Sequence, residues 1–292
     1  MRLSIITINY NNADGLRKTL ASVASQTYRA IEHIIIDGGS TDGSVDIIRE
    51  YEGQLHITHS TIRIQWLSEK DNGIYHAMNK GLRKATGSYI QILNSGDILA
   101  APDVTERMMN ALHSFTRLTL NDKISIPILY GNMLKSYDGK KIIRDTCGNR
   151  MYTPESFLYF YNGTLNHDCA YIRRDLFDKY GLYNEDMKIC SDWEWYVKAI
   201  VLGGEKPVYT NIDVTIFDMN GISESGGKNK ELIIKERREY LEKILPASVL
   251  HDYGQFSFPV LQYQRLKKYH LWGLVYFLER VLFKLEKWRL LR

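Results

Sequence analysis

The chain has 292 residues, of which 44% are hydrophobic and 25% are charged, and its formal net charge at pH 7 is +4. These values are typical of a soluble globular protein with one large α/β domain and an appendage, or with two modest domains. No run reaches the roughly 18 consecutive apolar residues that a membrane-spanning helix needs, so no such helix is predicted.

The cysteines indicate a reducing compartment. The chain has three, Cys147, Cys169 and Cys190, which are widely separated and form no CxxC pair. An odd and scattered set argues against a disulfide framework or a zinc knuckle. Met1 runs directly into a strand-like segment without a small-residue cleavage site, so no secretory signal peptide is predicted. We therefore expect a cytoplasmic protein.

The positive charge is concentrated near the C-terminus. Residues 262–292 contain eight Lys or Arg and two Glu, a net charge of +6, which leaves −2 for the rest of the chain. The basicity is therefore a property of this tail and says little about the main body.

Strand-like apolar runs alternate with helix-like segments four times in the first hundred residues. The predicted strands are 3–9, 32–37, 62–67 and 88–93. The predicted helices begin at Asp14, at Ser40 or Asp42, and after a turn at Asp71. Such alternation with short connections predicts a mostly parallel sheet with helices on both faces.

From about residue 100 the rhythm changes. Helices are predicted at 103–118, 191–202 and 228–244, strands at 124–134 and 206–217, and a loop-rich aromatic stretch at 136–166. Gly and Ser crowd residues 221–227, which predicts a mobile loop or a domain boundary. We therefore divide the chain into a main domain at 1–225 and a helical region with the basic tail at 226–292.

Polar side chains follow each of the four early strands. They are Thr7, Asn9 and Tyr10, then Asp37, then Asp71, and finally Asp97. Parallel strands deliver such groups to one edge of the sheet, where open α/β folds bind ligands. Neither GxGxxG nor GxxxxGK[ST] is present, and carboxylates at this edge suit a ribose, a base edge or a divalent cation. Taken alone, Asp37-Gly38-Gly39-Ser40 is equally well explained as a strand-to-helix turn with a capping acid.

Four segments stand in a characteristic order and spacing. They read SIITINYNNADGLRKTLASVASQTY, IIIDGGSTDGS, DNGIYHAMNKGLRKATGSYIQILNSGD and ICSDWEWYVKA. Together, over residues 1–225, they resemble the family 2 glycosyltransferases, which are inverting enzymes with the GT-A fold. The resemblance implies an α/β protein with a Rossmann-like, mostly parallel sheet flanked by helices, and a C-terminal helical extension.

The resemblance also implies the reaction. It predicts transfer of a hexosyl or N-acetylhexosaminyl group from a nucleotide-diphosphate sugar to a hydroxyl group of a glycan acceptor. Bacterial surface polysaccharide assembly, with a lipid-linked acceptor, is the expected setting. The sugar, the nucleotide base and the linkage are not readable from the residues.

Individual roles follow from the same resemblance. The expected donor-binding residues are Thr7, Asn9, Tyr10, Asp37, Asp71, Asn79, Asn94, Ser95 and Asp97. Asp97 would also bind Mg²⁺ or Mn²⁺, and Asp192 would act as the general base. The expected acceptor contacts are His167, Asp168 and Trp193, although His and Trp side chains in such positions are also common as structural residues.

Two departures from the family pattern weaken the phosphate and metal side of the site. Asn94-Ser95-Gly96-Asp97 stands in place of the usual acidic run, so only one carboxylate remains, and an amide is a weaker metal ligand. Met78 replaces the usual Arg of the ARN.G segment. Lys80 or a residue of 218–228 would then have to supply the positive charge.

Asp192 also has a simpler explanation. It lies at the start of a predicted helix, where an acid is favoured as a cap and by the helix dipole. Asp186 is a second candidate base, whereas Glu194 would face away from Asp192 on a helix.

The tail has the pattern of an interfacial helix. Between 271 and 288, apolar residues recur at helical spacing and form one stripe, with Arg280, Lys284 and Lys287 on the other side. Each cation near an anionic leaflet contributes about 1 kcal/mol, so the tail predicts a peripheral protein on the inner face of the cell membrane. Docking on the catalytic domain or on a second copy in a homo-oligomer is the alternative.

Three other functions remain open at this point. A sugar-nucleotide pyrophosphorylase would need a GxGxRL-type loop where this chain reads NYNNADG. A non-catalytic binding or scaffold protein would fit the reduced acidic motif. Nucleic-acid binding is disfavoured, because the basic residues are interleaved with an apolar stripe and form no polar groove.

Overall fold

The computed structural model describes residues 1–57, 61–118, 125–137, 141–145, 154–218, 229–268 and 271–289. The chain divides into two units, Met1–Tyr240 and Leu241–Arg292. Cys147 and the Gly/Ser segment at 221–227 lie outside the described residues.

The first hundred residues form the alternating units that the sequence predicts. The elements are β1 (Leu3–Asn9), α1 (Ala13–Ala24), β2 (Ile31–Asp37), α2 (Ser44–Ile57), β3 (Arg63–Ser68), α3 (Ile74–Lys84) and β4 (Tyr89–Ile92). β1 pairs in parallel with both β2 and β4, and β2 pairs in parallel with β3. β1 and β2 are buried along their whole length, as expected for parallel strands covered on both faces.

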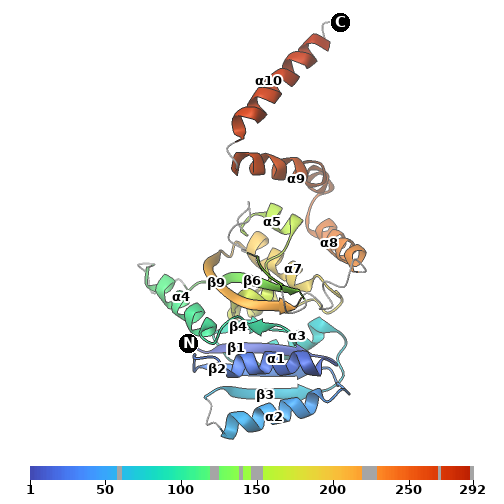
Figure 1. The fold of residues 1–292 in the computed structure, drawn as a ribbon. Coiled ribbons are helices and arrows are strands. Elements are labelled where there is room, and N and C mark those ends of the chain that lie inside the picture. Colours follow the sequence, from blue (N-terminus) through green and yellow to red (C-terminus); the bar gives the residue numbers. More distant parts are fainter. Residues whose placement is uncertain are drawn as a thin grey trace. The chain divides into compact units, whose positions relative to one another are not determined.

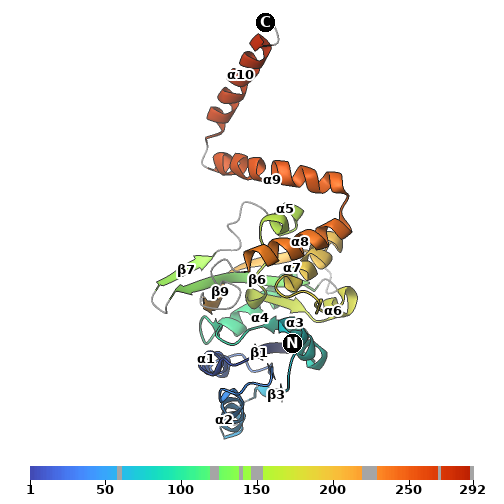
Figure 2. The same cartoon turned by 90° about the vertical axis from the view of Figure 1, so that its right-hand side faces the viewer.

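The second part extends the same sheet with strands in both directions. Its elements are β5 (Ile98–Leu99), α4 (Val104–Leu118), β6 (Ile128–Tyr137), β7 (Lys141–Asp145), α5 (Phe157–Asn162), η2 (His167–Cys169), β8 (Ala170–Arg173), α6 (Asp175–Tyr180), α7 (Ser191–Tyr196), η3 (Val197–Leu202) and β9 (Pro207–Asp218). The strand order is β3-β2-β1-β4-β8-β6-β9-β5, with β7 beside β6 (Figures 1 and 2).

Two predictions for this part need correction. The stretch at 136–166, predicted as loop-rich, contains β7 and α5. β7 forms a strand because it pairs with β6 in antiparallel register. The helix predicted at 191–202 is present, but its second half, η3, is a π-helix. π-helical turns are rare and often lie near functional sites.

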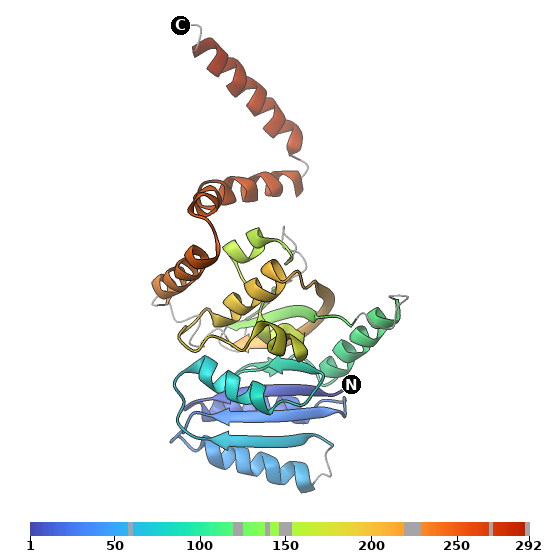
Figure 3. The ribbon, with the colours of Figure 1, turned by 180° about the vertical axis from the view of Figure 1, so that it is seen from behind.

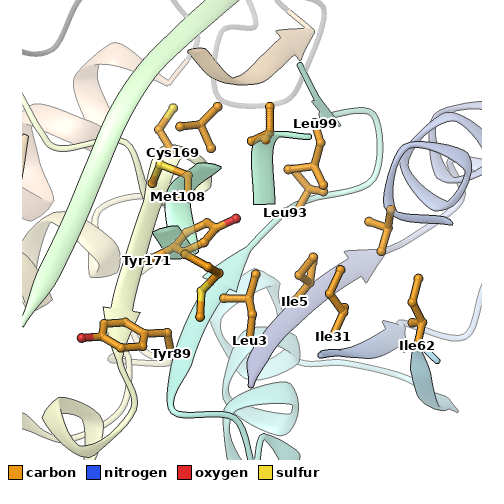
Figure 4. Close-up of a cluster of buried hydrophobic side chains, with 14 of the residues drawn as sticks. Leu3, Ile5, Ile31, Ile62, Tyr89, Leu93, Leu99, Met108, Cys169 and Tyr171 are labelled. Atoms are coloured by element: carbon orange, nitrogen blue, oxygen red, sulfur yellow. The ribbon is translucent and has the colours of Figure 1, made fainter. Parts of the chain in front are cut away.

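Helices cover the two faces of the parallel strands. Leu16 and Leu20 of α1 join a buried cluster with residues of β1 and β2 on one face. Figure 4 shows Leu3 and Ile5 of this cluster. On the other face α3 packs against β1 and β2, and Figures 2 and 3 show it on the side opposite α1. A Cβ atom on Gly81 of α3 would lie 2.4 Å from Ile6 Cγ2, so this close packing requires glycine.

Local capping explains where two of the helices begin. α1 is capped by Asn12, whose Oδ1 accepts from the Gly15 N–H over 3.2 Å, and not by the predicted Asp14. Asp42 binds the start of each helix, because its Oδ1 accepts from the Ser44 N–H of α2 over 3.1 Å and its Oδ2 accepts from the Ala13 N–H of α1 over 2.8 Å. Asp42 therefore joins the starts of both helices.

The C-terminal helices are α8 (Lys230–Ile244), α9 (Ala247–Lys268) and α10 (Trp272–Arg289). The division between the units falls at Tyr240, within α8, and therefore later than the predicted boundary at 225. The physical reason is that the first turns of α8 are bonded to the main unit, for example through Glu236. Among the described residues, no helix is long and apolar enough to cross a membrane.

Candidate active site

The carboxyl ends of β1 and β2 present a buried acid at one edge of the sheet. Asn9 and Asp37, their last residues, stand opposite each other, and Asn9 Nδ2 donates to Asp37 Oδ1 over 2.8 Å. Hydroxyl groups of Ser40 and Ser68 donate to the same carboxylate over 2.5 and 2.7 Å. Burial opposes the charge, but these hydrogen bonds hold the pKa of Asp37 below its ordinary value, so it is ionised at neutral pH.

Asp37 is itself 0% exposed. Its carboxylate also accepts from the backbone N–H groups of Gly39 and Ser40, and these bonds stabilise the turn after β2. A direct contact with a base or ribose stays a prediction.

Tyr10 and Asp71 flank the backbone of Gly38 at the outer side of this edge. A Cβ atom on Gly38 would lie 3.1 Å from Tyr10 Cδ2 and 3.3 Å from Asp71 Oδ2. Tyr10 is 67% exposed, an unusual position for an aromatic ring. An exposed ring beside a carboxylate can stack on a base while the acid binds a hydroxyl group. The structure thus brings together two of the predicted donor-binding residues.

Lys80 does not provide a free charge for a phosphate. Its Nζ lies 2.5 Å from Asp71 Oδ1 and 2.7 Å from Glu69 Oε1, and His76 Nδ1 lies 3.3 Å from the same oxygen of Asp71. Two carboxylates already neutralise the ammonium group. The alternative source, residues 219–228, lies outside the described part of the chain.

The turn between β4 and β5 is held in place by α1. It contains the predicted donor-binding residues Asn94, Ser95 and Asp97. Gly96 has φ +108°, a conformation that favours glycine. The Thr19 hydroxyl accepts from the Gly96 N–H over 3.0 Å and donates to the Asp97 carbonyl over 2.8 Å. The Asn12 amide also donates to the Ser95 carbonyl over 3.0 Å, so two side chains from around α1 fix this turn.

A line of polar side chains joins this turn to Asp192. The Asn94 amide lies 3.2 Å from His167 Nε2, and His167 Nδ1 lies 3.1 Å from Asp192 Oδ2. The Tyr75 hydroxyl lies 3.0 Å from Asp192 Oδ1. Four segments of the chain therefore converge, and His167 links Asp192 to the turn that carries Asp97. We call this set, Tyr75, Asn94, His167 and Asp192, the base cluster.

Within the base cluster, His167 and Asp192 form an ion pair at neutral pH. Burial opposes a charge on His167, but the hydrogen bond and charge of Asp192, with Asp168 and Asp97 nearby, raise the pKa of His167 to about 9. Burial also opposes the charge on Asp192, but the bonds from His167 and Tyr75 hold the pKa of Asp192 below its ordinary value. Asp192 is therefore an ionised carboxylate, available to accept a hydrogen bond or a proton.

Several side chains that were predicted to bind donor or acceptor are hydrogen-bonded to other groups of the protein. Thr7 is buried with its hydroxyl 3.0 Å from His33 Nε2, and Asp168 accepts from the Thr215 hydroxyl over 2.7 Å. Asn79 is buried and donates to the Tyr183 carbonyl over 2.8 Å. These side chains lie beneath the site and support it, because their polar atoms already have partners.

Trp193 also faces the interior. It is 1% exposed, and its Nε1 donates to the Phe160 carbonyl over 2.7 Å. It therefore presents no ring face on which an acceptor sugar could stack, which corrects the prediction of an acceptor contact. His167 is the one predicted acceptor residue that the structure places beside Asp192.

The turn after β4 can hold a divalent cation only together with oxygen atoms from a bound diphosphate. Among the described residues, no group of three or more His, Cys, Asp or Glu side chains could hold a metal ion. Asp97 supplies one carboxylate, and the Asn94 amide oxygen is buried without a partner. Mg²⁺ is commonly held by one or two carboxylates together with substrate phosphates, so these residues fit such an ion when a diphosphate is bound.

Two residues of the site were missed at the level of sequence. Tyr75 lies within a recognisable segment, but a tyrosine carries no charge pattern that would mark a contact with Asp192. Glu236 accepts hydrogen bonds from the segment just before Asp192, and only the folded chain reveals this.

Comparison with known proteins identifies the family. The family model described as Glycosyl transferase family 2 matches residues 4–181. An uncharacterized glycosyltransferase of Mycobacterium tuberculosis (strain CDC 1551 / Oshkosh) is 31% identical over 223 residues, which are 75% of this chain and 76% of the relative. A PGL/p-HBAD biosynthesis glycosyltransferase of Mycobacterium bovis (strain BCG / Pasteur 1173P2) is 25% identical over 236 residues, 80% of this chain and 81% of the relative.

Solved structures show the same fold. The structure of S. aureus TarS 1–349 has a TM-score of 0.61 at 18% identity and covers 91% of this chain and 72% of its own. The mannosyltransferase PcManGT from Pyrobaculum calidifontis, in complex with GDP-Man and Mn²⁺, has a TM-score of 0.61 at 19% identity and covers 90% and 73%. The matches favour a glycosyltransferase over a pyrophosphorylase or a non-catalytic scaffold. The chain therefore belongs to glycosyl transferase family 2 and has the GT-A fold.

Proposed function

We propose that the protein transfers a sugar from a nucleotide-diphosphate donor to an acceptor hydroxyl group with inversion at the anomeric carbon. The observation that carries this proposal is the base cluster, which sets an ionised carboxylate opposite the turn that holds Asp97. A single displacement needs two such features, one on each side of the reacting sugar: a group that binds the leaving diphosphate and a base for the incoming hydroxyl.

On the donor side, Tyr10 and Asp71 would bind the nucleoside beside Gly38, and Asn9 and Asp37 would hold the turn beneath it. Asp97 would hold Mg²⁺ or Mn²⁺ together with the donor diphosphate. When bound, such an ion supplies positive charge that stabilises the leaving diphosphate.

On the acceptor side, Asp192 would accept the proton of the attacking hydroxyl group. His167 and the Tyr75 hydroxyl, which shares its hydrogen between Asp192 and the Ile189 carbonyl, each contact one of its two oxygens and so restrict the orientation of the carboxylate. General-base assistance of this kind typically contributes about 10²–10⁴-fold to the rate. His167, part of whose side chain reaches solvent, would contact the acceptor.

The neighbours support a nucleotide-sugar donor. TarS 1–349 is solved in complex with UDP-GlcNAc, and PcManGT with GDP-Man. We propose transfer of a hexosyl or N-acetylhexosaminyl group, with the donor to be identified by titrating UDP-, GDP- and dTDP-sugars in the presence of Mn²⁺.

The variant Asp97→Ala tests the proposed role of Asp97 in metal-dependent donor binding. We expect this variant to lose Mn²⁺-dependent donor binding, and the control Asp103→Ala, an exposed acid in the same region of the chain, to keep it. Unchanged Mn²⁺-dependent binding in Asp97→Ala would remove Asp97 from the metal site.

We further propose that α10 recruits the enzyme to the inner face of the cell membrane, where a lipid-linked glycan acceptor would be found. α10 exposes many large apolar side chains, namely Tyr276, Phe277, Leu278, Val281, Leu282 and Phe283. Arg280 lies on the same helix with its guanidinium 6.0 Å from the centre of the Tyr276 ring. Apolar and aromatic side chains beside cations are typical of helices at a membrane interface.

Sedimentation with vesicles tests this recruitment. The full chain should pellet with vesicles that contain anionic lipid and much less with neutral ones, because each cation adds about 1 kcal/mol near an anionic surface. A chain that ends at residue 261 should stay in the supernatant with both. Equal behaviour of the two chains would reject recruitment by this tail.

A further inference from the structure

The segment just before Asp192 is held by a side chain from a distant helix. Glu236 of α8 is 7% exposed. Its Oε1 accepts from the backbone N–H of Lys188 over 2.6 Å, and its Oε2 accepts from the N–H groups of Ile189 and Cys190 over 3.1 and 3.0 Å. One carboxylate thus binds three consecutive backbone donors.

These three donors have no substitute partner in the local chain. Cys190 is the N-cap of α7, and its side chain makes no capping hydrogen bond. A helix start leaves backbone N–H groups unsatisfied, and a carboxylate there also interacts favourably with the positive end of the helix dipole. From outside the segment, Glu236 therefore satisfies the Cys190 N–H at the helix start and the two N–H groups that precede it.

Ile189 connects Glu236 to the base cluster. Its N–H donates to Glu236, while its carbonyl oxygen lies 2.5 Å from the Tyr75 hydroxyl, which also lies 3.0 Å from Asp192 Oδ1. The peptide on either side of Ile189 is thus held from both directions. A shift of this residue would move both Tyr75 and the start of α7.

α8 also contacts the residue that follows Asp192. The guanidinium of Arg237 lies 5.0 Å from the centre of the Trp193 ring, and the Tyr240 ring packs edge-on against Trp193 at 5.8 Å. One helix thus fixes the chain both before and after Asp192. The arrangement exceeds what is needed to cover a helix end, because all of these contacts bear on one short segment.

We propose that Glu236 is a positioning residue for Asp192, which fixes the backbone at 188–190 and so sets the direction of the base carboxylate toward the acceptor hydroxyl. This inference rests on the proposed role of Asp192. A displacement of about 1 Å at a catalytic group can cost about 10²-fold in rate, so a loosened segment has a measurable effect.

The test is a double-mutant cycle with Glu236→Gln and Asp192→Asn. Gln keeps the size of Glu236 but has one acceptor oxygen in place of two and no charge, so at least one of the three N–H groups loses its partner. Alone, Glu236→Gln should lower kcat about 10- to 100-fold with the donor KM within about twofold of the wild-type value. In the Asp192→Asn background the same change should alter kcat by less than about twofold, because Glu236 acts through the base. Glu239→Gln, an exposed acid on the same helix, is the matched control and should keep wild-type kcat.

A second measurement does not depend on activity, so it tests the proposal even if Glu236→Gln folds poorly. Amide hydrogen exchange of the segment 188–190 should be slow in the wild-type protein and faster in Glu236→Gln, with Glu236→Asp as a milder replacement that keeps the charge. Fast exchange of these amides in the wild-type protein would overturn the proposal.

The outcomes separate this inference from the function on which it rests. Wild-type kcat in Asp192→Asn would overturn the base assignment and this inference with it. A large loss in Asp192→Asn with wild-type kcat in Glu236→Gln would overturn only the positioning role. Losses that multiply in the double variant would also overturn it, because they would show that Glu236 acts independently of Asp192.

Discussion

His167→Gln is the change that tests the electrostatics of the base cluster most fully. The imidazole lies 3.1 Å from Asp192 Oδ2 and is charged in the folded protein. Gln retains an amide that can donate a hydrogen bond, but it cannot carry the positive charge. The variant therefore removes the charge and keeps part of the polar contact.

The magnitude follows from the pKa of His167, which rises from 6.5 to about 9 on folding. Each pKa unit corresponds to about 1.4 kcal/mol, so the charge contributes on the order of 3 kcal/mol to the free energy of unfolding. Because the folded pKa is the higher one, this stability is fully present below pH 6.5 and is lost as the pH rises through about 9. The stability difference between wild type and His167→Gln should shrink over that range.

Urea unfolding at several pH values between 6 and 10 measures this difference. The comparison of the two proteins cancels the titration of all groups that they share. We expect wild type to be the more stable protein at pH 6 and the difference to fall by about 3 kcal/mol toward pH 10. A difference that stays constant over the whole range would refute the ion pair.

Two further changes test neighbouring contacts. Tyr75→Phe removes the hydroxyl that helps to lower the pKa of Asp192, whereas burial, which raises that pKa, remains. The acidic limb of the kcat–pH profile should therefore move to higher pH. An unchanged limb would contradict the contact between Tyr75 and Asp192. Gly81→Ala places a Cβ 2.4 Å from Ile6 Cγ2 and should destabilise the main unit by about 1–3 kcal/mol in thermal unfolding. Gly53→Ala in α2 is its control, because a Cβ there meets nothing within 4 Å, and it should be neutral or stabilising by up to about 1 kcal/mol. Equal effects of the two glycine changes would refute the packing argument.

The alternating elements of the first hundred residues could be predicted because they depend on local patterns. Continuous apolar runs indicate strands buried on both faces, and Asp42 has the chemistry of a helix cap. The cap of α1 was misplaced because Asn12 and Asp14 are both good caps, and only the backbone geometry selects Asn12. Later strands were harder to predict, because β7 depends on pairing with β6 and not on its own sequence.

The candidate site shows the same division. The order of the motifs predicted which chain segments would meet, and Asn94, His167 and Asp192 do meet. It could not predict which side chains face inward. Thr7 and Trp193 stand in segments that belong to the site, but Thr7 pairs with His33, and Trp193 donates to a buried carbonyl. The direction of a side chain depends on packing partners that are far away in the sequence, as does the contact of Glu236 with residues 188–190.

Sugar transfer by Asp192→Asn tests the central claim most directly. The variant should bind donor as tightly as wild type and transfer sugar about 10²–10⁴-fold more slowly, because the amide cannot accept the acceptor proton. Asp186→Asn, which changes an exposed acid six residues earlier, should transfer at the wild-type rate. Wild-type transfer by Asp192→Asn, or a comparable loss in Asp186→Asn, would contradict the assignment of Asp192 as the base.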